Sequence, residues 1–128
     1  MIKLLLLCIV WLTATLCCSG QRYLGLSKFQ IQNLVEKEFE GNGESVEGKA
    51  PYIYAYKGLY SIACYFKYNR CFMYASSIKG ADLMSLKKSL VISDYKYLSN
   101  NKYIKNNVIA EIVYNENAGE FVTYVYYK

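Results

Sequence analysis

The sequence has 128 residues, with 15 basic side chains, 10 acidic side chains and no histidine. This length suits a single domain. The charged side chains, with a net charge of +5, are interspersed along the chain and form no block typical of nucleic-acid or membrane-surface binding. Without histidine the chain lacks the commonest general base, the histidine-paired nucleophiles and most zinc sites. The carboxylates also form no pair spaced for glycoside hydrolysis. We therefore expect no enzyme activity, no cofactor and no metal.

The first twenty residues predict export. Lys3 precedes a nearly unbroken apolar run at Leu4–Leu16, and Cys17-Cys18-Ser19-Gly20 follows, which is the order of a secretory signal peptide. The run is shorter than the roughly 20 residues that a membrane-spanning helix needs. We expect a signal peptide at residues 1–20, a single domain at residues 21–128, and a secreted or periplasmic protein.

Three outcomes of export remain open. Cleavage after Gly20 would leave Gln21 as the mature N-terminus, while lipid attachment at Cys17 or Cys18 would give an outer-membrane lipoprotein. An uncleaved anchor is the third. Cleavage is favoured because a lipoprotein signal wants a small residue before the modified cysteine, where this chain has Leu16 or Cys17. Cleavage would remove three of the five cysteines and the only tryptophan, and would keep all fifteen tyrosines.

The first predicted helix begins at a capping box. Ser27 is placed as N-cap with Gln30 three residues later, so each side chain can bond the other's backbone amide. Apolar residues then recur at helical spacing up to Phe39. Gly41 is expected to end the helix as a left-handed cap and to open a polar loop that runs to Lys49.

The rest of the chain predicts strands around a second helix. The helix is expected over Asp82–Val91 with Asp82 as its cap. Alternating β-favouring residues indicate strands at Tyr52–Tyr56, Tyr60–Phe66, Cys71–Ser77, Val108–Tyr114 and Glu120–Tyr127. The order α-β-β-β-α-β-β predicts an α+β fold, with an antiparallel sheet of four to five strands and both helices on one face. No convincing internal repeat is visible.

The two cysteines of the predicted domain lie on strands that we expect to pair. Matching Phe66 with Cys71 puts Cys64, Cys71 and Met73 on one face and makes the cysteines diagonal neighbours, with Cα atoms about 7–8 Å apart. That is slightly too far for an unstrained disulfide. Buried free thiols are favoured, and a Cys64–Cys71 disulfide, closed by a bulge in the turn at Tyr68 or Asn69, is the alternative.

Aromatic side chains form the candidate binding site. One strand is expected to present Tyr52, Tyr54 and Tyr56 on one face, and the outward face of the next hairpin to carry Tyr65, Phe72 and Tyr74. Such a surface could bind a peptide, a glycan or an envelope protein. The simpler interpretation, which we favour, is that tyrosine is a good strand residue whose ring covers a sheet. The stretch Tyr95–Lys105 is a second candidate, as a functional loop or as a plain surface connection.

Gly25-Leu26-Ser27-Lys28, with the helix Phe29–Phe39 and the tyrosine-rich strands after it, resembles small exported α+β domains of Bacteroidetes type. More distantly it is similar to β-lactamase-inhibitor-like and outer-membrane-assembly lipoprotein domains. The resemblance implies an envelope location and protein binding, and it carries over no functional residue.

We therefore expect a non-catalytic module that binds an envelope protein or a surface polymer. The alternative is a lipid-anchored structural or inhibitory protein that occupies a partner's groove. We expect no nucleic-acid partner, and membrane contact only through a lipid anchor.

Overall fold

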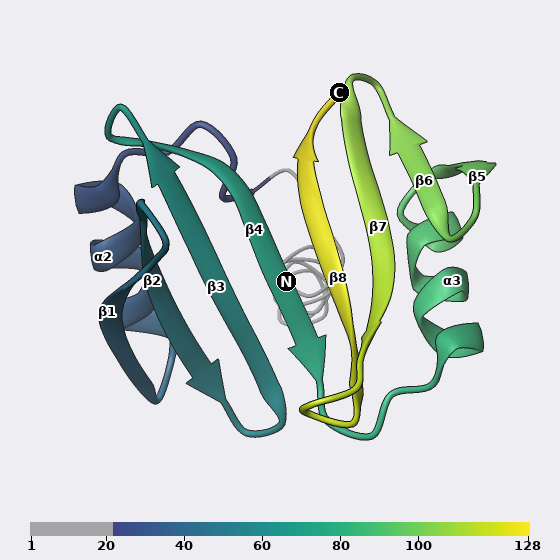
Figure 1. The fold of residues 1–128 in the computed structure, drawn as a ribbon, viewed down its shortest axis with the longest axis horizontal. Coiled ribbons are helices and arrows are strands. Elements are labelled where there is room, and N and C mark those ends of the chain that lie inside the picture. Colours follow the sequence, from purple (N-terminus) through teal and green to yellow (C-terminus); the bar gives the residue numbers. More distant parts are fainter. Residues whose placement is uncertain (1–21) are drawn as a thin grey trace, which may run out of the picture.

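The computed structural model describes residues 22–128, so the predicted signal peptide, its cleavage site, Cys17 and Cys18 lie outside the described residues. Those residues form two helices and a single eight-stranded antiparallel sheet (Figure 1). None of the helices found there has the length and apolar character needed to cross a membrane.

The elements follow one another as a helix and four strands, twice. The first set is α2 (Lys28–Glu38), β1 (Gly41–Glu47), β2 (Ala50–Lys57), β3 (Tyr60–Lys67) and β4 (Arg70–Ile78). The second set is α3 (Leu83–Ile92), β5 (Lys96–Ser99), β6 (Lys102–Lys105), β7 (Val108–Asn115) and β8 (Glu120–Tyr127). In the sheet the strands lie in the order β1-β2-β3-β4-β8-β7-β6-β5, so the two sets meet where β4 pairs with β8. The element order therefore repeats, although the sequence shows no repeat.

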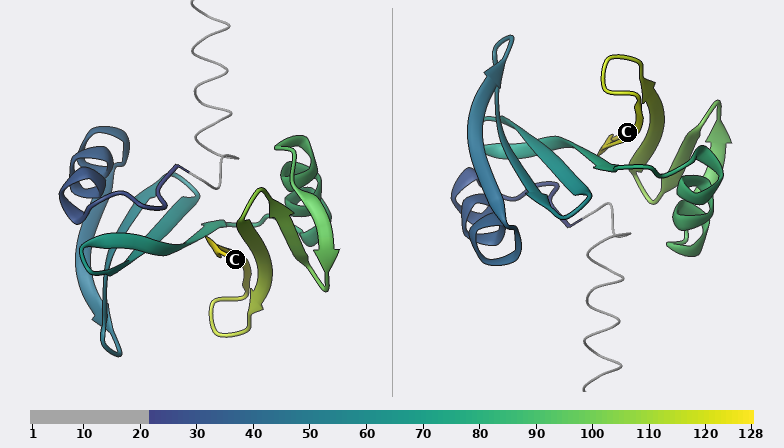
Figure 2. Two further views of the ribbon diagram at one scale, coloured as in Figure 1. Left: turned by 90° about the horizontal axis from the view of Figure 1, so that it is seen from above. Right: turned by 90° about the horizontal axis from the view of Figure 1, so that it is seen from below.

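Both helices lie on the same face of the sheet, as the sequence predicts, with α2 near the β1 end and α3 near the β5 end (Figure 2). Each helix begins at the predicted cap. Ser27 and Gln30 form the complete capping box, and the Asp82 carboxylate accepts a bond from the Ser85 amide at 2.7 Å. Ile31, Val35 and Leu90 turn toward the sheet and are buried in the core.

The prediction of four to five strands is wrong, because β1, β5 and β6 were not anticipated. Gly41–Glu47 has no alternation of apolar residues, yet it pairs with β2 along its whole length. The helix before it ends at Glu38, and its C-cap residue Phe39 has extended backbone, so Gly41 is not a left-handed cap. The stretch Tyr95–Lys105, for which a functional loop and a plain surface connection were the alternatives, forms the β5–β6 hairpin, which turns at Asn100 and Asn101 with positive φ angles of 30° and 63°.

Two tyrosines of β2 explain how a glycine-rich segment becomes a strand. Gly41 and Gly43 lie opposite Tyr56 and Tyr54, whose rings cover the glycines so closely that an added Cβ would collide with them. An aromatic ring that lies over a glycine on the neighbouring strand supplies the cross-strand contact that the glycine lacks. The strand thus depends on side chains that its own sequence does not contain.

A bulge in β4 changes the predicted faces of the β3–β4 hairpin. Phe66 pairs with Cys71 as predicted, but Tyr65 pairs with Met73, which leaves Phe72 as an extra residue. One extra residue reverses the alternation of every residue after it. Tyr74 therefore points to the helix side, where it is 3% exposed and its ring meets that of Tyr23 at 5.0 Å. Met73 takes its place on the opposite face, so the predicted outward position of Tyr74 is wrong.

Candidate functional site

The face of the sheet opposite the helices carries two rows of side chains that cross neighbouring strands. Figure 2 shows the β1–β2 and β7–β8 turns projecting on this side. The strand register gives the first row as Tyr52, Tyr65, Met73, Tyr126, Ile109 and Ile104. The second row is Tyr54, Ala63, Ala75, Tyr124, Glu111 and Lys102. We call the tyrosines of this side the tyrosine face: Tyr52, Tyr54, Tyr56, Tyr65, Tyr124 and Tyr126.

The tyrosine face has aromatic rings on either side of small side chains. On β2 and β3, the Tyr52 ring lies 5.1 Å from that of Tyr65 and 6.3 Å from that of Tyr54, between ring centroids. On β8, Tyr124 and Tyr126 occupy the same two rows. Ala63 and Ala75 separate Tyr54 from Tyr124 at the centre of the sheet. The second row therefore has apolar rings with low side chains between them, while Met73 lies between Tyr65 and Tyr126 in the first row.

Carboxylates orient two of these tyrosines. The Tyr65 hydroxyl donates to Glu47 Oε2 at 2.8 Å, and burial together with Glu47 raises the pKa of Tyr65. The Tyr126 hydroxyl donates to Glu111 Oε1 at 3.5 Å, and burial and the Glu111 charge raise the pKa of Tyr126. Both hydroxyls therefore remain neutral donors at physiological pH. Rings held in this way lose less freedom when a partner covers them.

The structure brings together four of the six predicted aromatic residues. Tyr52, Tyr54, Tyr56 and Tyr65 share the tyrosine face, with Tyr54 43% and Tyr56 49% exposed. Phe72 is the bulge residue and Tyr74 belongs to the core. The sequence does not show that β8 contributes to this surface, because the alternating tyrosines of β8 do not reveal that this strand pairs with β4.

The two cysteines lie on the helix side, away from the tyrosine face. Cys64 and Cys71 are free and buried, and the bulge lies at Phe72 rather than in the turn. The Cys71 thiol donates to the Met73 carbonyl oxygen at 3.4 Å. A hydrogen bond with the Cys71 thiol, together with burial, raises the pKa of Cys64. A thiol held protonated and away from solvent is a poor nucleophile.

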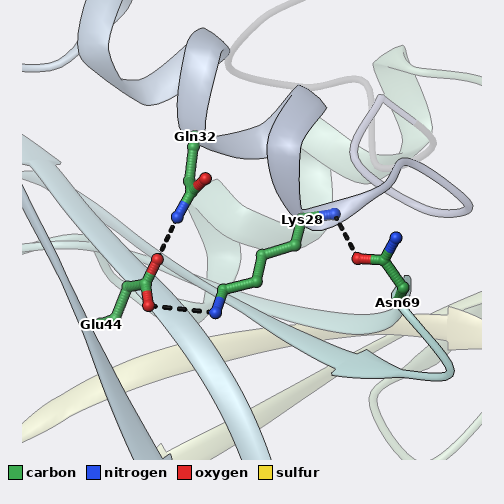
Figure 3. Close-up of polar contacts among 4 residues, drawn as sticks. All are labelled: Lys28, Gln32, Glu44 and Asn69. Carbon is green, nitrogen blue, oxygen red and sulfur yellow. Dashed lines mark hydrogen bonds and ion pairs between the residues drawn. The ribbon is translucent and has the colours of Figure 1, made fainter.

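Contacts between α2 and β1 position the strand that the tyrosines cover. Lys28 Nζ lies 3.1 Å from Glu44 Oε2, and the Gln32 side-chain amide donates to the other oxygen of Glu44 (Figure 3). The Lys28 backbone amide donates to Asn69 Oδ1 at 3.4 Å. Contact with the Lys28 side chain lowers the pKa of the Glu44 carboxyl. These bonds hold β1 against α2, and their role is structural.

The outward side of α3 is a second exposed apolar surface. Met84, Val91 and Ile92 line an open hollow together with the stems of Lys87 and Lys88, and Ile92 is 80% exposed. The hollow lies on one short helix and contains almost no polar surface that could orient a ligand. The tyrosine face is continuous across several strands, and it is the stronger candidate.

Among residues 22–128, no three or more His, Cys, Asp or Glu side chains gather where they could hold a metal ion. Comparison of the chain with protein-family models, with curated proteins and with solved structures gave no match. The function must therefore be inferred from the residues and their geometry.

Proposed function

We propose that this chain is a non-catalytic module of the cell exterior or envelope, and that it binds another protein through the tyrosine face. The observation that carries the proposal is the continuity of this face: aromatic rings on β2, β3 and β8 flank the side chains of β4 on the side that neither helix covers. Tyrosine is enriched in protein interfaces because its ring buries apolar area while its hydroxyl forms hydrogen bonds. The export signal predicted from the first twenty residues supports the location.

Ring geometry favours a protein partner over a carbohydrate polymer. The Tyr52 ring plane is inclined by 51° to that of Tyr54 and by 32° to that of Tyr65, so the three rings form no common flat platform for stacking sugars. The low centre at Ala63 and Ala75 can instead receive side chains that project from a partner surface. Complementary packing of that kind is characteristic of protein interfaces.

The double variant Tyr54→Ala with Tyr124→Ala tests this proposal. It removes one ring from each side of the alanine centre, and we expect partner affinity to fall at least about tenfold, as truncation of central aromatic residues typically does. A photo-crosslinking aromatic residue at position 54 identifies the partner in extracellular or envelope fractions, and the affinities of wild type and variant for that purified partner are then compared.

Tyr68→Ala is the matched control. Tyr68 is 90% exposed at the turn between β3 and β4 and is not part of the tyrosine face. The control should bind as the wild type does, and a crosslinker at position 68 should capture nothing specific. Undiminished binding by a correctly folded double variant would disprove the proposal.

A further inference from the structure

The sheet has two free edges of different character. In the described part of the chain, β1 pairs only with β2 and β5 pairs only with β6, so both lie at the outside of the sheet (Figure 1). An edge strand presents unpaired backbone donors and acceptors to any strand that approaches. All four residues of β5 are exposed, with Tyr97 66% exposed, and Val46 of β1 is 63% exposed. Neither edge strand contains a proline that would block pairing.

The two edges carry opposite charge. Strand β1 contains Glu44 and Glu47 and no basic residue, and Glu40 directly precedes it. Strand β5 begins at Lys96 and has no acidic residue, while its neighbour β6 begins and ends with lysine. Some of this charge is neutralised within the molecule, because Glu44 contacts Lys28 and Lys102 contacts Glu111, and Asp94 lies just before β5.

Exposed charges remain at each edge after this neutralisation. On the edge strands themselves, Glu47 stays exposed on β1 and Lys96 on β5. Beside β1, Lys49 lies in the β1–β2 turn and Lys57 ends β2 near Glu40, and beside β5, Lys87 and Lys88 lie on α3. We call the β1 edge the acidic edge and the β5 edge the basic edge.

The direction of the strands makes the two edges compatible. All seven neighbouring pairs of the sheet are antiparallel, so β1 and β5 run in opposite directions. A second copy in the same orientation, placed beside the first, would therefore present its β5 antiparallel to β1. The helices of both copies would then lie on the same side, and the antiparallel alternation would continue across the junction.

We propose that the protein associates head to tail, with the basic edge of one copy pairing with the acidic edge of the next. Two acidic or two basic edges repel each other, which disfavours a two-fold dimer built on like edges. A head-to-tail contact leaves one free edge of each kind, so the assembly can lengthen. Since β5 is four residues long, the contact is small and its formation depends on concentration. This contact uses the edges and not the rings of the tyrosine face, although Glu47 of the acidic edge also accepts the bond from Tyr65.

Sedimentation velocity of the purified protein over a range of concentrations tests the proposal. At low salt we expect the sedimentation coefficient to rise with concentration. In 1 M NaCl, where the screening length is about 3 Å, the rise should largely disappear. A wild-type protein that remains monomeric under both conditions would overturn the proposal.

Charge reversal gives the sharper test. Glu47→Lys places a lysine on both edge strands and Lys96→Glu places a glutamate on both, so each should remain monomeric alone. Mixed in equal amounts, they should associate again, which only pairing between unlike edges explains. Association of either variant alone at the wild-type level, or a mixture that stays monomeric, would contradict the proposal.

Control variants separate edge charge from net charge and from misfolding. Glu116→Lys in the β7–β8 turn and Lys79→Glu between β4 and α3 make the same charge changes away from both edges, and both should associate as the wild type does. Glu47 also accepts the bond from Tyr65, so Glu40→Lys provides a second basic variant without that loss. Circular dichroism confirms the fold of each variant before its sedimentation is measured.

Discussion

Phe72 and Tyr74 are close neighbours on β4 with very different surroundings. Phe72 is the bulge residue and is 37% exposed, while Tyr74 is buried in the core against Tyr23. The bulge thus determines whether a large aromatic residue belongs to the surface or to the interior.

We expect Tyr74→Ala to lower the free energy of unfolding by about 3–5 kcal/mol, the usual cost of removing a buried aromatic side chain. Phe72→Ala should cost less than about half as much, because its ring is already partly in water. Urea unfolding of the two variants measures the difference. Similar losses for both would contradict the bulge and restore the simple alternation in which both residues face outward.

Local alternation correctly places Tyr52, Tyr54 and Tyr56 on one face, because a period of two within one strand depends on that strand alone. The inward turn of Tyr74 could not be read in the same way. A bulge arises from the pairing of two strands, and nothing in the residues around Phe72 marks it.

Strand β1 is stabilised mainly by its neighbour β2. Gly43 lies beneath the Tyr54 ring, and Ser45 lies opposite Tyr52 on the same face of the sheet. A side chain at position 43 would have to displace the ring, which would expose it and weaken the β1–β2 contact.

We expect Gly43→Ala to destabilise the protein by roughly 1 kcal/mol or less, the range of a cross-strand pair, although glycine is usually the poorer strand residue. Hydrogen exchange of the β1 amides should become faster, while that of β7 and β8 should not change. Ser45→Ala on the same strand is the control and should leave exchange almost unaltered. A gain in stability from Gly43→Ala would refute the role given to the Tyr54 ring.

The elements that could be predicted from the sequence are those with local signals. Ser27 with Gln30, and Asp82, mark helix starts that the structure confirms. The missed strands lack such signals: β1 needs the rings of β2, and β5 and β6 are four residues each, too short to show a period. The fold class was therefore partly predictable, whereas the strand number and the union of β2, β3 and β8 in one surface were not.

Buried tyrosines make the whole molecule sensitive to alkaline pH. Burial raises the pKa of Tyr23 and of Tyr95 to about 12, and raises the pKa of Tyr74 well above its usual value of 10. In the unfolded chain these hydroxyls lose their protons near pH 10. Since the unfolded state then binds fewer protons than the folded state, the stabilisation is complete below pH 10 and declines as the pH rises toward 12 and above.

We expect the buried tyrosines to ionise above pH 10 together with unfolding, as followed by absorbance at 295 nm and far-ultraviolet circular dichroism. Tyr95→Phe should move the transition to higher pH, because its buried hydroxyl has no hydrogen-bond partner in the described structure and its removal abolishes one titrating group. Ionisation of all fifteen tyrosines with the secondary structure intact would contradict the prediction.

The repeated order of one helix and four strands has a geometric consequence. A pair of identical halves joined at β4 and β8, with both helices on one face, would be a dimer related by a two-fold axis through the centre of the sheet. The short connection between β4 and α3 makes this pair one covalent molecule. In a true dimer both outer strands would be copies of one sequence and would carry the same charge. Within a single chain the two ends are free of that constraint, so that one can be acidic and the other basic and the molecule has a direction.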